Sequence, residues 1–199
     1  MMRFLTAMLG LFLLAQPAFA AATALESVKT TADAVLATLR DPKYQSDRAQ
    51  RQEQIKNLIR ARFDFEEMSK RALGPNWPNQ SPANQQQFVQ RFTDLLLNTY
   101  IDRLDDYKGV RISYDGERRD GDTATVNTKV LDPKGQQYSL NYRLRAANGD
   151  WKIYDVVVED ISLVNNYRSQ FNRMLSKESF SDLLQKLSSK QFSGTGGSS

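Results

Sequence analysis

The chain has 199 residues with 27 basic and 23 acidic side chains, and it contains no cysteine and no histidine. The lack of cysteine excludes disulfides, thiol catalysis and thiolate metal sites, and the lack of histidine excludes a Ser-His-Asp triad and removes the commonest transition-metal ligand. The small positive charge is too weak to indicate a nucleic-acid-binding protein.

Residues 1–22 have the three parts of a secretory signal peptide. Arg3 precedes an apolar stretch over residues 4–15, and the small-x-small cleavage motif Ala18-Phe19-Ala20 follows. The apolar stretch is too short for a membrane anchor, which needs about 20 apolar residues. We therefore expect cleavage after Ala20 or Ala22 and location in the bacterial periplasm. The remaining length is enough for one domain with its own core.

The first half of the mature chain predicts four helices, over residues 23–41, around 55–59, and over 64–74 and 81–109. Apolar side chains recur at helical spacing in each of them, so that each helix would bury one face. Most of the boundaries have a chemical signal, because N-capping side chains begin three helices and proline or glycine ends three. These signals are Thr23, Asp64 and Ser81 at the beginnings, and Asp41-Pro42, Gly74-Pro75 and Gly109 at the ends.

Residues 110–158 change to the alternation of side chains that is typical of β-strands. Tight turns at Asp120-Gly121, residues 132–135 and Asn148-Gly149 separate four strands, which predicts a twisted antiparallel meander. On the fourth strand, strict alternation would place one set of apolar side chains on one face and a second set on the other. These sets are Tyr154, Val156 and Val158, and Trp151, Ile153 and Val157.

Helical spacing returns after the strands. One helical face would hold Ile161, Val164, Tyr167, Phe171 and Leu175, and a last helix would cover residues 180–187. The Gly- and Ser-rich residues 193–199 are expected to be a flexible tail. The fold class is therefore α+β, a single domain over residues 23–192 with about six helices on a four-stranded meander.

The apolar face of the sheet has two interpretations. It fills a core, which is the default in close-packed proteins, or it lines an apolar cavity between sheet and helices. Asp155 also has two interpretations. It is a general base in an apolar strand, or, as we favour, it accepts hydrogen bonds from Arg143 or a backbone amide. The pairs Arg118-Arg119 and Arg143/Arg145 are either solvated side chains or a docking surface for an acidic partner or phosphate headgroups.

Three blocks of sequence resemble, in order and spacing, the signatures of the MlaC family of exported toluene-tolerance proteins. They are Phe63–Met68 with Ala72-Leu73-Gly74 and Trp77, Phe88-Val89 with Leu95-Leu96 and Thr99-Tyr100, and Trp151–Val156 with Ser162-Leu163-Val164 and Asn166–Phe171. The resemblance covers residues 25–187. Where the family commonly has a glycine shortly before the Ser-Leu-Val block, this chain has Asp160, and we expect this difference to change either the turn into the following helix or the charge at the pocket rim.

The resemblance implies a carrier of diacyl phospholipid rather than an enzyme, with no cofactor, no metal and lipid as its cargo. It implies transport between an outer-membrane lipoprotein–porin complex and an inner-membrane ABC transporter complex, which maintains outer-membrane lipid asymmetry. Docking to these partners is assigned to Arg118, Arg119, Arg143 and Arg145. The residues expected to contact the lipid tails are Leu73, Trp77, Phe92, Leu96, Tyr100, Tyr142, Tyr154, Val156, Val158, Val164, Tyr167 and Phe171.

Two other functions stay open from the sequence. One is an enzyme of the cone-shaped α+β kind, similar to ketosteroid isomerases, that uses Asp155 and a tyrosine on a hydrophobic substrate. The other is a structural envelope protein with a solid core. A phospholipid bound to protein that never met detergent would favour the carrier over both.

Overall fold

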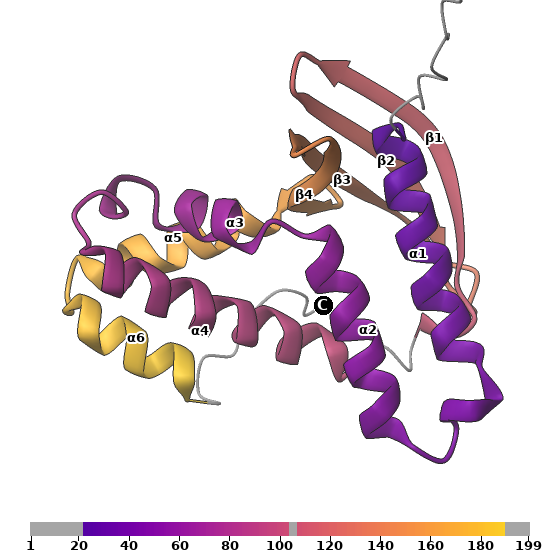
Figure 1. The fold of residues 1–199 in the computed structure, drawn as a ribbon, viewed down its shortest axis with the longest axis horizontal. Coiled ribbons are helices and arrows are strands. Elements are labelled where there is room, and N and C mark those ends of the chain that lie inside the picture. Colours follow the sequence, from indigo (N-terminus) through magenta and orange to yellow (C-terminus); the bar gives the residue numbers. More distant parts are fainter. Residues whose placement is uncertain (1–21, 104–106, 190–199) are drawn as a thin grey trace, which may run out of the picture.

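The computed structural model describes residues 22–103 and 107–189, so almost all of the predicted signal peptide and the whole Gly- and Ser-rich tail lie outside the described residues. The described chain is α+β, as predicted (Figure 1). Its helices are α1 Ala24–Arg40, α2 Arg48–Arg62, α3 Phe65–Leu73, α4 Pro82–Ile101, α5 Leu163–Leu175 and α6 Phe180–Ser188, with short 3₁₀ helices at Pro42–Tyr44 and Gly74–Asn76. Its strands are β1 Arg111–Asp120, β2 Thr123–Leu131, β3 Gln137–Ala147, β4 Asp150–Val158 and β5 Ile161–Ser162.

The predicted helix beginnings are confirmed by their caps. Thr23 and Glu26 form a complete capping box, and the side chains of Asp64 and Ser81 accept hydrogen bonds from backbone amides of α3 and α4. The predicted end of the fourth helix at Gly109 is wrong, because α4 ends at Ile101. Continuation would place several carboxylates of the Asp102–Asp106 stretch at the negative end of the helix dipole.

The sheet has one strand more than the meander predicted from the sequence. Its order is β1-β2-β3-β4-β5, with antiparallel pairing throughout. The added strand β5 pairs Ile161 with Val158 across a two-residue turn, Glu159-Asp160. The placement of Ile161 on a helical face is therefore wrong, since α5 begins at Leu163 with Ser162 as its N-cap. A strand of two residues is too short to show alternation in the sequence.

A bulge in β4 corrects the predicted faces of this strand. Arg143 pairs with Asp155 and Leu144 with Ile153, which leaves Tyr154 without a partner on β3. Because one extra residue reverses the alternation beyond it, Trp151 and Ile153 join the face of Val156. These side chains pack together with Tyr142 and Leu144, and Tyr154 turns instead toward the helices of the other half of the molecule.

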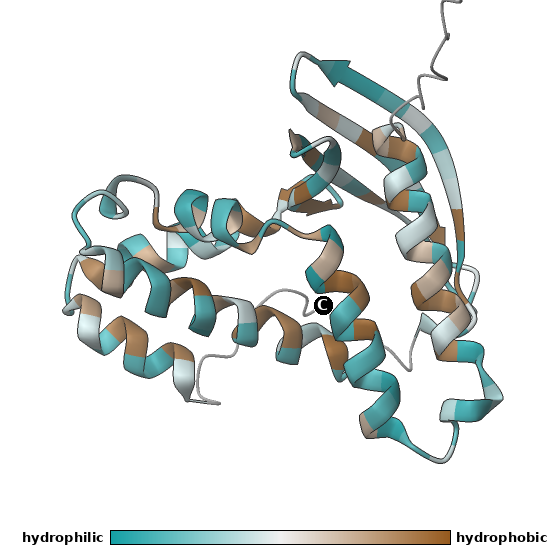
Figure 2. Ribbon diagram, viewed as in Figure 1, coloured by the Kyte–Doolittle hydropathy of each residue, from teal (hydrophilic) through white to brown (hydrophobic). Residues whose placement is uncertain are grey.

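The described structure has two hydrophobic cores, one in each half of the molecule (Figure 1). We call the cluster between α3, α4, α5 and α6 the helical core, and the cluster between α1 and β2–β4 the sheet core. A third small cluster of Leu39, Ile55 and Ile101 joins α1, α2 and α4. In Figure 2 every helix carries both hydrophobic and hydrophilic segments, as expected of helices that bury one face. No helix of the described residues is long and apolar enough to cross a membrane.

The segment between α2 and α3 ties the two cores together. The Asp64 amide donates to the Ile153 carbonyl at 2.8 Å, and the Asp64 carboxylate accepts from Arg145 at 2.6 Å. At the end of α2, Arg62 donates to Thr31 of α1 at 3.1 Å and to Asp150 of β4 at 2.7 Å. Although burial opposes ionisation of Asp150, hydrogen bonds from Arg62, Lys152 and the Trp151 amide lower its pKa to about 2.

The β4–β5 turn generates a stability prediction. Glu159 and Asp160 have φ of 46° and 64°, the left-handed region that glycine adopts at no steric cost and other residues at about 1–2 kcal/mol. After the entropy that glycine adds to the unfolded chain is subtracted, Asp160→Gly is expected to raise the free energy of unfolding by up to about 1 kcal/mol. Urea denaturation measures the change. Asp160→Ala is the control, and an equal gain from alanine would contradict the backbone explanation.

Candidate functional site

A cavity of about 260 Å³ lies where the helical core and the sheet core meet. Its walls come from the end of α2, the first half of α3 and the segment before it, the second half of α4 and the segment after it, the beginning of β3, the end of β4 and the beginning of α5. The lining residues are Ile59, Phe63, Phe65, Met68, Leu96, Leu97, Tyr100, Ile101, Tyr107, Tyr138, Leu140, Val156, Val158 and Leu163. The cavity is therefore built from segments far apart in the sequence.

The lining has almost no polar chemistry. Apart from the hydroxyls of Tyr100, Tyr107 and Tyr138, its side chains are hydrocarbon, with one thioether at Met68. Among residues 22–103 and 107–189, no carboxylate, ammonium or guanidinium group belongs to the wall. Such a surface binds apolar groups by desolvation.

Exposed apolar side chains mark the mouth of the cavity. Among the described residues, the large hydrophobic side chains that are exposed are Tyr100, Tyr107, Val158 and Ile161, at 37%, 38%, 41% and 64%. The first three line the cavity, and Ile161 pairs with Val158. Since exposed apolar clusters are typical of ligand or interaction sites, the mouth is the part of this surface most suited to contact an apolar partner.

The structure brings four of the expected tail-contacting residues to the cavity and places the others elsewhere. Leu96, Tyr100, Val156 and Val158 line it. Tyr142 packs against the sheet core. The helical core holds Leu73, Phe92, Val164, Tyr167 and Phe171, with Trp77 and Tyr154 packed against it. Contact of each of these residues with lipid stays a prediction.

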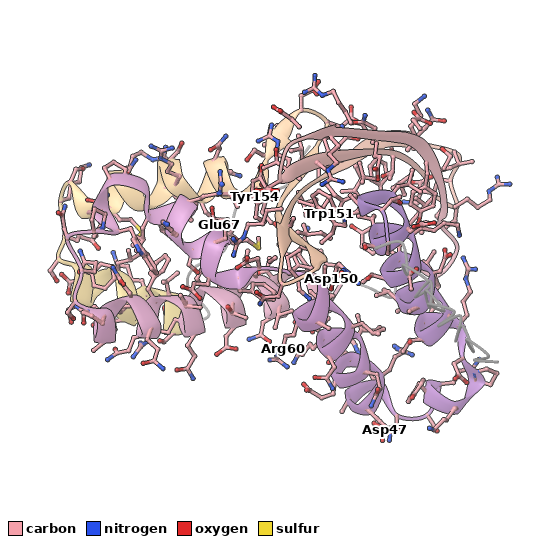
Figure 3. All side chains as sticks on the ribbon, turned by 45° about the horizontal axis from the view of Figure 1, so that its top comes forward. Asp47, Arg60, Glu67, Asp150, Trp151 and Tyr154 are labelled. Carbon is pink, nitrogen blue, oxygen red and sulfur yellow. The ribbon has the colours of Figure 1, made fainter. Side chains whose placement is uncertain are left out.

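The helical core is filled by aromatic rings. Phe88, Phe92, Tyr167 and Phe171 contact one another with ring centroids 5.1–5.7 Å apart. Each of the four is at most 2% exposed. Tyr154 lies at the edge of this core beside Glu67 (Figure 3), where Arg71 donates to Glu67 at 2.7 Å and stacks 4.2 Å above the Tyr154 ring. None of these residues lines the cavity.

Most of the lining was not assigned to the site from the sequence. Helical spacing at Phe65 and Met68 and strand alternation at Tyr138 and Leu140 were the available signals. The side chains that sequence reasoning left out are Ile59, Phe63, Phe65, Met68, Leu97, Ile101, Tyr107, Tyr138, Leu140 and Leu163. Spacing identifies buried faces but not which part of a buried face stays unfilled.

The four arginines assigned to partner docking differ in their surroundings. Arg143 donates to Asp155 at 3.2 Å, and Arg145 donates to Asp64 at 2.6 Å. Hydrogen bonding to Asp64 raises the pKa of Arg145 above its usual value. Arg119 stacks 5.1 Å from the Trp151 ring centroid, whereas Arg118 is exposed on β1. Docking stays a prediction for all four, and three of them also stabilise the fold.

Asp155 has the structural environment that we favoured from the sequence. It is 2% exposed and accepts from Arg143 at 3.2 Å, from the Ser162 hydroxyl at 2.7 Å and from the Val164 amide at 3.1 Å. It is absent from the cavity lining. The carboxylate therefore fixes the beginning of α5, and no substrate in the cavity would contact it. No cluster of three or more potential metal ligands occurs among residues 22–103 and 107–189.

Comparison with known proteins gives a consistent result. The family model described as MlaC protein matches residues 29–189. The toluene tolerance protein Ttg2D of Pseudomonas putida is 32% identical over 92 residues, 46% of this chain and 43% of that protein. The intermembrane phospholipid transport system binding protein MlaC of Haemophilus influenzae is 24% identical over 138 residues, 67% of this chain and 64% of that protein. The chain thus matches less than two thirds of the length of either relative.

A solved structure extends the similarity to the fold. The phospholipid-binding protein from Ralstonia solanacearum, determined in complex with a phospholipid, is 31% identical and superposes with a TM-score of 0.75. The match covers 83% of this chain and 95% of that one. The similarity therefore extends over most of the fold.

Replacement of Asp155 by asparagine tests its role. The amide keeps one acceptor oxygen for three donors, so Asp155→Asn is expected to lower the free energy of unfolding by about 1–3 kcal/mol. Lipid content of the folded variant is expected to be unchanged. Ser162→Ala, which removes a single donor, is the milder control in the same urea titration. Full stability of Asp155→Asn together with lost lipid would contradict the structural role.

Proposed function

The chain belongs to the MlaC family, and from this premise we propose that it carries a diacyl phospholipid through the bacterial periplasm. The observation that carries the proposal is the apolar cavity at the junction of the two cores, with a mouth of exposed apolar side chains. The acyl chains enter this cavity and the headgroup stays at the mouth. The phospholipid complex of the similar protein from Ralstonia solanacearum supports the choice of ligand.

The size of the cavity has a consequence for loading. At about 260 Å³ it lies just below the range of about 300–1,000 Å³ that is usual for pockets of drug-sized ligands. Two acyl chains need more room than this. We therefore propose that the walls move apart when lipid enters, which is feasible because the cavity lies between two separately packed cores.

The energetics of burial favour delivery by direct contact. Burial is worth about 0.8 kcal/mol per methylene group, so that two chains of about 15 methylenes gain roughly 24 kcal/mol before ordering costs. Release into water would be correspondingly slow. We propose that lipid leaves through docking to membrane complexes, an outer-membrane lipoprotein–porin complex and an inner-membrane ABC transporter complex, which offer the tails a continuous apolar path.

Neither alternative function is favoured by the site. An enzyme that uses Asp155 needs this carboxylate at the substrate, but it is held by Ser162 and the Val164 amide and lies outside the cavity wall. A solid structural protein would not need the unfilled volume. Carriage requires only binding and release, so no catalytic group is part of the proposal.

Lipid analysis of the purified protein tests the proposal. Protein isolated from the periplasm of a producing bacterium without detergent is expected to contain phospholipid in stoichiometric amount. Organic extraction followed by mass spectrometry measures the amount and the lipid class. Protein that is folded but free of lipid in repeated preparations would contradict the carrier function.

A matched pair of substitutions on β3 tests where the lipid lies. Leu140 lines the cavity, whereas Leu144 is fully buried in the sheet core. Leu140→Trp is expected to fill the cavity and displace lipid with little loss of stability. Leu144→Trp is expected to overpack a filled core and to cost about 1–3 kcal/mol in the free energy of unfolding. Retained lipid in a stable Leu140→Trp variant would place the lipid elsewhere.

A further inference from the structure

In the described part of the chain, the polar side chains of the cavity wall are three tyrosines. Tyr100 comes from α4, Tyr107 from the segment after it, and Tyr138 from the start of β3. Tyr107 interacts electrostatically with both other tyrosines, and all three side chains line the same cavity. Because Tyr100 and Tyr107 are each more than one third exposed, this group lies at the mouth. We call these three residues the tyrosine cluster.

The environment keeps the hydroxyls of Tyr100 and Tyr138 available as donors. Burial raises the pKa of Tyr138 to about 12 and also raises the pKa of Tyr100 above its ordinary value of 10. Both side chains therefore stay protonated through the neutral range. Tyr100 has the Tyr167 hydroxyl on one side and the cationic Arg103 as a further neighbour. Tyr138 has the Asp132 carboxylate nearby instead.

The order of chemistry along the cavity matches the order of groups in a phospholipid. The inner wall is hydrocarbon, the tyrosine cluster follows at the mouth, and Arg103 lies next to Tyr100. In a diacyl lipid the hydrocarbon tails are followed by two ester carbonyls, which are hydrogen-bond acceptors, and then by the anionic phosphate. Tyrosine suits such a boundary because its ring is apolar and its hydroxyl is polar.

From this arrangement we infer that the tyrosine cluster donates hydrogen bonds to the ester carbonyls of the bound lipid and so selects lipids with ester-linked tails. The inference rests on the proposed carrier function and adds the groups that position the cargo. The phosphate then lies beside Arg103 rather than beside Asp132. A lipid with ether-linked tails has no carbonyl and leaves the hydroxyls without these acceptors, which is unfavourable.

Competition between two lipids tests the inference. Protein stripped of lipid is incubated with vesicles that hold equal amounts of the diester and diether forms of one phosphatidylethanolamine with tails of the same length. The protein is then separated from the vesicles, and its lipid is extracted and identified by mass spectrometry. The unmodified protein is expected to take up the diester form about fivefold in excess, the ratio that one net hydrogen bond gives.

Variants separate the tyrosine cluster from the rest of the cavity. The triple variant Tyr100→Phe/Tyr107→Phe/Tyr138→Phe is expected to take up both lipids equally at unchanged total amount, because it loses all three hydroxyls and keeps the rings. Tyr44→Phe, in the 3₁₀ helix between α1 and α2 and away from the cavity lining, is expected to keep the preference.

Each of the other possible results contradicts one part of the inference or the carrier function on which it rests. Equal uptake of both lipids by the unmodified protein overturns the inference and leaves the carrier function standing. A preference that survives in the triple variant overturns the role of the tyrosine cluster. Uptake of neither lipid contradicts the carrier function itself, and the inference with it.

Discussion

One buried carboxylate determines how the two halves of this molecule meet. Asp155 on β4 receives hydrogen bonds from β3, from β5 and from the first turn of α5. A buried carboxylate without partners would cost several kcal/mol, so its donors must stay where they are. The start of α5 is thereby fixed against the sheet, and α5 positions the aromatic rings of the helical core. The location of the cavity follows from this arrangement.

The unfilled volume lowers the free energy of unfolding of the protein without ligand. At about 24 cal/mol per Å³, a cavity of about 260 Å³ corresponds to roughly 6 kcal/mol if it were closed and dry. Domains of this kind are stable by only about 5–15 kcal/mol in total. Opening to solvent at the mouth reduces the penalty, but a ligand that fills the volume would still stabilise the folded state. A fold that keeps such a cavity is therefore better explained by an occupant than by packing.

The sequence predicted the elements well and the site only partly, for a physical reason. Caps and turns act through neighbouring residues, so Thr23, Asp64 and Ser81 could be assigned before the structure was known. The bulge at Tyr154 depends on how two strands pair, and β5 depends on a turn without glycine, so neither has a local signal. The position of the cavity depends on which apolar side chains of the two cores do not contact one another. This distinguishes Phe92, inside the filled core, from Leu96, one helical turn later at the cavity.

The order of elements along the chain also has a consequence for how the protein folds. Helix α3 contacts α5 and α4 contacts α6, although the whole sheet lies between them in sequence. Strands β1 to β5 follow one another through short turns, so their pairing closes only small loops. The contacts of α3 with α5 and of α4 with α6 form only when the two ends of the intervening segment, residues 102–162, come together. Hairpins that form early shorten the distance between those ends. We therefore expect the hairpins to form first and the helices around the cavity to assemble last, so that mutations in α5 and α6 change the unfolding rate more than the folding rate.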